Sequence, residues 1–123
     1  MLEATLMNAS AQKRGEWEPV LRHAINLTAE SYPQKVYTLF VADTLDYNTI
    51  NIWRAVAAVK LKSSTTRKKT EHVVIMPFTN EHICHFIESN ICDDAIITAI
   101  DHSYDEIKAN FDETWHEKIL ATI

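Results

Sequence analysis

The residues of this chain best suited to chemistry lie near its amino terminus. Glu3 stands in a short run of alternating apolar and polar residues. A helix through the following region would bring four side chains onto one stripe, because they follow at steps of four, three and four: Gln12, Glu16, Pro19 and His23. Carboxylate oxygens are ligands that Mg²⁺ accepts, and an imidazole titrates near neutral pH. Hydrolysis of a phosphodiester needs such parts, because a cation polarises the phosphoryl oxygen while other groups orient the water.

Both features also have a plainer interpretation. A carboxylate on a short strand is often an exposed edge residue, and a polar helix stripe is often a solvated face. The region also contains the chain's only glycine, Gly15, and Pro19. Because proline cannot donate a hydrogen bond inside a helix, either a helix begins near Glu18 or a longer helix is kinked there.

A basic stretch is the second candidate for function. Five of the twelve basic side chains fall within ten positions: Lys60, Lys62, Arg67, Lys68 and Lys69. The net charge of −5 argues against attraction of nucleic acid by the whole surface, so DNA binding would depend on this local patch. Such side chains could contact DNA phosphates in a salt-sensitive way. The alternative is a mobile, solvated connection between two elements, because a Ser/Thr/Lys-rich loop spans Ser63 to Thr70.

The elements that must position these residues alternate between strand and helix. Apolar and β-branched runs predict three strands, and apolar residues at helical spacing predict four further helices. The strands are expected at 2–6, at 36–42 with both faces covered and a central place, and at 72–76, ended by Pro77. The helices are expected at 47–61, capped by Asp43 or Asp46, at about 80–89, capped by Thr79 or Asn80, at 93–111, and from 112 to the end. Parallel strands joined by helical crossovers suit this order.

Length and composition predict one soluble α/β domain over residues 1–123. Cys84 and Cys92 match no disulfide framework or zinc pattern, so we expect free thiols and a reducing compartment. No secretory signal is visible, and no apolar run approaches the roughly 18 residues that a membrane span needs. We therefore expect a cytoplasmic protein that does not bind membranes.

Several segments, taken in order, resemble the cleavage domain of type IIS restriction and nicking endonucleases of the PD-(D/E)XK superfamily. The resemblance covers roughly residues 2 to 90 and is carried by Leu2–Leu6, Gln12, Glu16–Val20, Arg22–His23, Tyr37–Ala42, Asn48–Thr49 and Ile75–Thr79. It implies a restriction-endonuclease-like mixed sheet with flanking helices. It also implies double-stranded DNA as the substrate and Mg²⁺ as the cofactor.

The resemblance further assigns roles to individual residues. Glu3 becomes the metal-binding carboxylate, and Thr5 stands where most of the superfamily has a lysine. Glu16 and His23 are implied to assist at the site, with Gln12 beside them. Because Thr5 carries no positive charge, stabilisation of the transition state would depend more on the metal and on His23.

The first acid of the superfamily's motif should precede Glu3, where this chain has only Met1 and Leu2. We therefore expect a chain truncated at its amino terminus, which needs a second nuclease subunit or the remainder of the enzyme and does not cleave DNA alone. The competing hypothesis is a non-catalytic interaction module or inhibitor subunit, whose acidic surface binds a basic partner.

Overall fold

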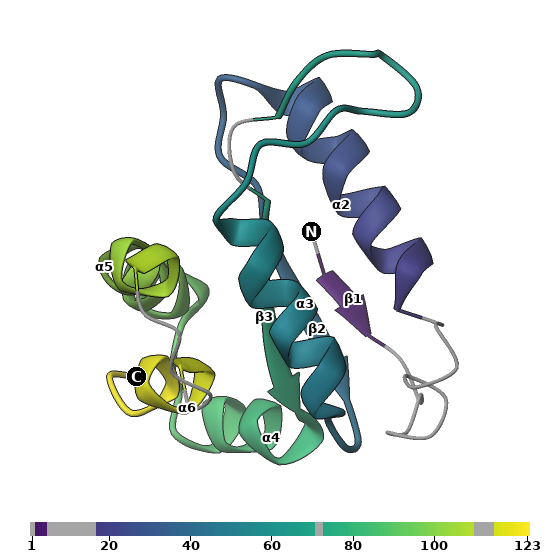
Figure 1. Ribbon diagram of the computed structural model, residues 1–123. Helices are drawn as coiled ribbons and strands as arrows, with labels where there is room; N and C mark the ends of the chain where they lie inside the picture. The colour runs from purple at the N-terminus through teal and green to yellow at the C-terminus, as the bar shows by residue number, and fades with distance from the viewer. Residues whose placement is uncertain (1, 5–16, 71–72, 110–114) are drawn as a thin grey trace.

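In the part of the chain that the structure describes, three parallel strands form one sheet. The computed structural model describes residues 2–4, 17–70, 73–109 and 115–123 (Figure 1). Strands β1 (Leu2–Ala4), β2 (Tyr37–Ala42) and β3 (Val74–Thr79) lie in the order β1-β2-β3, and both neighbouring pairs are parallel. The predicted central place of the second strand is confirmed. The resemblance implied a mixed sheet, whereas the described strands pair only in parallel.

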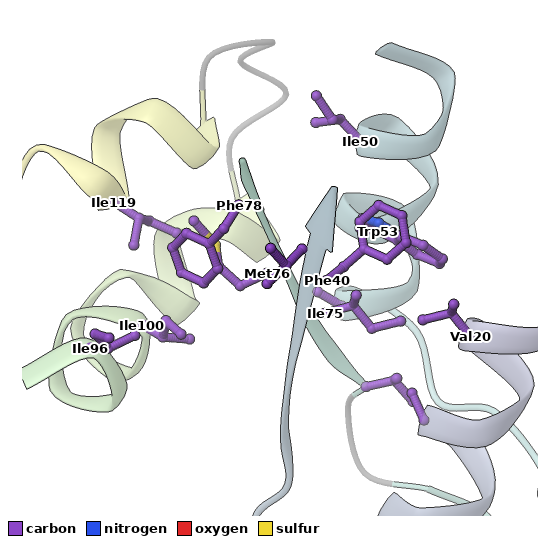
Figure 2. Packing of buried hydrophobic residues seen from close by; sticks show 14 of the residues in the cluster. Val20, Phe40, Ile50, Trp53, Ile75, Met76, Phe78, Ile96, Ile100 and Ile119 are labelled. Atoms are coloured by element: carbon purple, nitrogen blue, oxygen red, sulfur yellow. The ribbon is translucent and has the colours of Figure 1, made fainter. Parts of the chain in front are cut away.

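Helices pack on both faces of this sheet (Figure 1). Helices α2 (Glu18–Ser31) and α3 (Tyr47–Ala57) lie on one side, and α5 (Asp93–Ala109) and α6 (Trp115–Leu120) lie on the other. Helix α4 (Asn80–Glu88) continues directly from β3. Figure 2 shows Phe40 directed toward Trp53, while Phe78 is directed toward Ile119. The core is therefore two apolar layers, one on each face of the sheet.

Local signals explain where most helices begin. Helix α2 starts at Glu18 with Pro19 in its first turn, where a missing N–H costs nothing, so the first of the two sequence alternatives is confirmed. At α3, the carboxylate of Asp46 accepts a hydrogen bond from the backbone N–H of Thr49 at 3.1 Å, which selects Asp46 rather than Asp43 as the cap.

Two predicted boundaries were wrong. Helix α3 ends at Ala57 rather than at residue 61, because the backbone of Leu61 instead pairs with Thr70, accepting from its N–H at 2.6 Å and donating to its Oγ1 at 2.9 Å. Pro77 does not end the third strand but lies inside β3, opposite Phe40. Among the described strands β3 has one neighbour only, and an outer strand tolerates proline because one side of it needs no N–H.

Trp53 is the centre of the layer between the sheet and α3. Its side chain is fully buried, and its ring makes edge contacts with Phe40 at 5.4 Å and with Trp17 at 6.2 Å between centroids. It is therefore a core residue, as its place on an apolar stripe predicts. None of the helices in the described part of the chain is long and apolar enough to cross a membrane.

Candidate active site and nucleic-acid interface

Glu3 lies in the middle of β1, in register with Phe40 of β2. The sheet thus places the backbone of this residue beside the buried central strand. Of the five predicted catalytic residues, the structure places Glu3 and His23. The other three, Thr5, Gln12 and Glu16, lie outside the described residues.

His23 is exposed on α2 and belongs to a polar stripe. Val20 and Ala24 on the opposite side of the helix are buried in the core, 8% and 0% exposed. The stripe that begins with Pro19 and His23 continues through Asn26 and Glu30 at the same three- and four-residue steps. The carboxyl-terminal half of this stripe is not merely solvated, because Asn26 and Glu30 form hydrogen bonds with another segment of the chain.

That segment is residues 60–70, which we call the basic loop. It holds all five predicted DNA-binding cations, and each of them is exposed: Lys60, Lys62, Arg67, Lys68 and Lys69. An antiparallel bridge joins Lys62 to Lys69, and the N–H of Ser63 donates to the carbonyl of Lys68 at 2.8 Å. The basic loop is therefore a hydrogen-bonded turn.

Asn26 fastens the basic loop to α2. Its Oδ1 accepts from the Ser63 hydroxyl at 2.9 Å, from the Ser64 N–H at 3.1 Å and from the Ser64 hydroxyl at 3.2 Å. The Thr65 hydroxyl donates to the Glu30 carboxylate at 3.4 Å, one helical turn further on. Ser63 is only 1% exposed, and its hydroxyl also accepts from the N–H of Thr65. The attachment thus has a buried centre and an exposed, cationic rim.

Arg67 has an unusual backbone at the turn of the basic loop. Its φ is 61°, in the left-handed region that favours glycine because a Cβ atom is crowded there. The chain contains one glycine in all, and it is not used at this turn. A long cationic side chain therefore occupies a position that local backbone energetics would assign to glycine or asparagine.

A pocket of about 320 Å³ lies at the carboxyl ends of strands β2 and β3. Residues following both strands line it, together with two from α6: Leu45, Tyr47, Ile50, Thr79, Glu81, His82, His116 and Glu117. Open parallel sheets commonly bind ligands at this edge. The basic loop precedes β3 and so lies at the other end of the strands (Figure 1).

The environment of this pocket favours the neutral form of both its histidines. Burial lowers the pKa of His82, which outweighs the opposing effect of Glu81, and burial likewise lowers the pKa of His116. The Nδ1 of His82 accepts from the N–H of Thr79 at 2.9 Å, so its neutral form carries the proton on Nε2. Sequence reasoning did not identify this pocket. The Thr79-to-His82 capping spacing at a strand end was the available signal, but His116 comes from a helix far along the chain.

The metal-binding residue predicted from the sequence is Glu3, and the structure describes its backbone in β1. Among the side chains that the structure describes, no three histidine, cysteine, aspartate or glutamate residues are grouped to hold an ion. Mg²⁺ needs no such group, because it is commonly held by one or two carboxylates with waters and substrate phosphates. A glutamate has the oxygen chemistry that Mg²⁺ prefers, so Glu3 fits the ion by its donor type.

The fold and these residues define an α/β protein that carries a preformed cationic loop beside a parallel sheet. Comparison with family models is more specific, since residues 1–86 match the AlwI restriction endonuclease family. The match covers more than half of the chain, and the chain belongs to this family. Searches among curated proteins and among solved structures found no significant match. The substrate of such a family is DNA.

Proposed function

We propose that this chain contributes to metal-dependent hydrolysis of DNA phosphodiesters, as part of the cleavage domain of a type IIS restriction endonuclease of the PD-(D/E)XK class. One observation carries the proposal: the family match spans residues 1–86 and so includes β1 with Glu3, the stripe of α2 and the whole basic loop. The competing interaction module has no comparable support.

In this proposal Glu3 is the carboxylate that holds Mg²⁺. The bound ion would polarise the phosphoryl oxygen and lower the pKa of the attacking water. His23 stands exposed on α2 and is assigned to assist at the site. Glu16 and Gln12 are assigned to orient water or phosphate beside it, and Thr5 can donate a hydrogen bond but no charge.

The basic loop is assigned to the DNA backbone rather than to the bases. Lysine and arginine contacts with phosphates position a duplex and add salt-dependent affinity without reading sequence. The exposed cations of this loop could supply such contacts, although the net charge of the chain is −5. A second nuclease subunit or further parts of the enzyme would complete the site around Glu3.

Metal-linked thermal stability tests the central assignment. A ligand that binds only the folded state stabilises it by about 2.7 kcal/mol at a hundred times its Kd, which raises Tm by roughly 10 °C for a domain of this size. We expect Mg²⁺ or Mn²⁺ to raise the Tm of the wild-type chain and not of Glu3→Gln. The control is Glu18→Gln, an equal change at an exposed carboxylate that pairs with Arg22 on α2.

Either of two results would count against the proposal. The first is a wild-type chain whose Tm does not respond to Mg²⁺ or Mn²⁺. The second is a Glu3→Gln variant that keeps the metal response, or that keeps any Mg²⁺-dependent cleavage of supercoiled plasmid shown by the wild type. If Glu18→Gln also abolished the Tm response to metal, the assignment of the metal to Glu3 on β1 would not be supported.

A further inference from the structure

We propose that Asn26 is a positioning residue, which holds the basic loop against α2 in the arrangement that receives the phosphate backbone of double-stranded DNA. The inference rests on the proposed function, because it specifies where on this chain the DNA lies. Asn26 acts through the loop and touches no phosphate itself.

The first support is the concentration of hydrogen bonds on one atom. Three donors from Ser63 and Ser64 converge on the Oδ1 of Asn26, although these residues lie 37 and 38 positions away in the chain. Ser63 is a buried residue of the loop, so the loop is attached through its buried side while its cations stay in solvent. A surface arranged before binding loses less conformational entropy when it binds.

The second support is the charge of the loop. Within the described residues no acidic side chain forms an ion pair with Lys62, Arg67, Lys68 or Lys69. Arg67 keeps its long side chain at a left-handed backbone position, which costs stability that a glycine would not cost. Backbone strain retained at an exposed cation points to a role for that cation. Four exposed cations on one hydrogen-bonded turn fit a polyanion such as the phosphate backbone.

The third support is the shared face of α2. His23 and Asn26 are three residues apart, and Glu30 is a further turn along, so the proposed catalytic helper and the loop attachment lie on one stripe. From His23 to Glu30 the helix rises about 10 Å, at 1.5 Å per residue. That length equals about three base pairs of duplex, at 3.4 Å each. His23 and the basic loop are therefore close enough for one short stretch of duplex to span both.

A double-mutant cycle on DNA binding tests the inference. Affinity of the full chain for a fluorescent 30-base-pair duplex is measured by anisotropy in EDTA, over a range of salt concentrations. Lys68→Ala with Lys69→Ala removes two phosphate contacts and should reduce the magnitude of the slope of log K against log salt by about 1.8. The loss of affinity relative to the wild type should then be about 60-fold larger at 0.1 M salt than at 1 M salt. In an Asn26→Ala background the same two changes should cost less than about tenfold, because the loop is no longer held in place.

Matched variants separate positioning from general damage. Asn51→Ala makes the same change at an exposed site on α3, and Lys118→Ala removes a lysine from α6 at the opposite end of the sheet; both should leave binding near the wild-type value. Ser64→Ala removes one of the three hydrogen bonds at an exposed position, so it should fold and give a smaller loss in the same direction as Asn26→Ala.

The outcomes distinguish this inference from the proposed function. A folded Asn26→Ala chain with wild-type affinity overturns the inference alone, and so does a cycle in which the losses are additive. A wild-type chain that does not bind the duplex overturns both the inference and the proposed function. A third outcome is non-additive losses of DNA affinity for Asn26 and the loop lysines, without a Tm response to metal that depends on Glu3. That result supports the role of the basic loop in DNA binding and counts against the proposed nuclease function.

Discussion

Replacing Arg67 with glycine should separate folding from DNA binding in one substitution. The left-handed backbone at this residue costs an amino acid with a Cβ atom about 1–2 kcal/mol, and glycine avoids that cost. Glycine also gains conformational freedom in the unfolded chain, which offsets about 0.4–1 kcal/mol of the benefit. The net effect is a gain of about 0.8 kcal/mol in the free energy of unfolding, or a rise in Tm of roughly 3 °C.

DNA affinity should change in the opposite direction. Loss of one phosphate contact removes about 0.9 from the slope of log K against log salt, which is a factor of about eight between 1 M and 0.1 M salt. Anisotropy titrations at several salt concentrations measure the slope, and thermal melts of the same samples measure Tm. Arg67→Ala should show the same loss of affinity without the rise in Tm, because alanine keeps the Cβ atom.

Asn90→Gly provides the matched control, because Asn90 has a φ of 55° just beyond the end of α4. Asparagine tolerates this backbone better than arginine, so a smaller rise in Tm and no change in DNA binding are expected. A lower Tm in Arg67→Gly would refute the argument from backbone strain. An unchanged salt slope would refute the contact between Arg67 and phosphate.

Two further predictions concern the core and the pocket. Trp53→Ala should lower the free energy of unfolding, measured by urea titration, by about 3–5 kcal/mol. Trp53→Phe should cost under about 2 kcal/mol, because the buried Nε1 has no hydrogen-bond partner among the described residues. Equal losses in the two variants would contradict this explanation of the packing. Burial lowers the pKa of His82 and of His116, so the unfolded chain binds protons that the folded chain does not, and Tm should be fully maintained above pH 6.5 and fall as the pH drops below it. Replacing both histidines with glutamine should flatten this dependence between pH 5.5 and 7.5, and an unchanged profile would place its origin elsewhere.

Much of the fold could be predicted because its signals are local. The apolar run at Tyr37–Ala42 identifies a strand that is covered on both faces, and such a strand belongs in the centre of a sheet. The choice between Asp43 and Asp46 as a cap was open, since either side chain has the right chemistry. The early end of α3 could not be foreseen, because Thr70 competes for the backbone of Leu61 across nine positions.

The candidate site shows the same division between local and tertiary signals. The exposed stripe at His23 and the cluster of cations are visible in residue spacing and charge. Asn26 is not, since an asparagine inside a helix is unremarkable until Ser63 and Ser64 are brought to it. The pocket at the carboxyl edge was missed for a similar reason, because His116 reaches His82 only after α6 packs against the sheet.

The helices beyond the family match have a different physical task from the site. The match ends within α4, and Glu3, His23 and the basic loop all lie before that end. Helices α5 and α6 cover the second face of the sheet, where Ile100 and Ile119 are buried at 0% and 2% exposure. Each such side chain contributes about 1.5–3 kcal/mol when buried, and without a cover the β3 side chains on that face would meet water. The α5 cover is also tied to β2, where the Tyr37 hydroxyl donates to Asp101 at 2.5 Å. The carboxyl-terminal helices therefore stabilise the sheet, while the residues proposed for the site lie in the part of the chain that the family model matches.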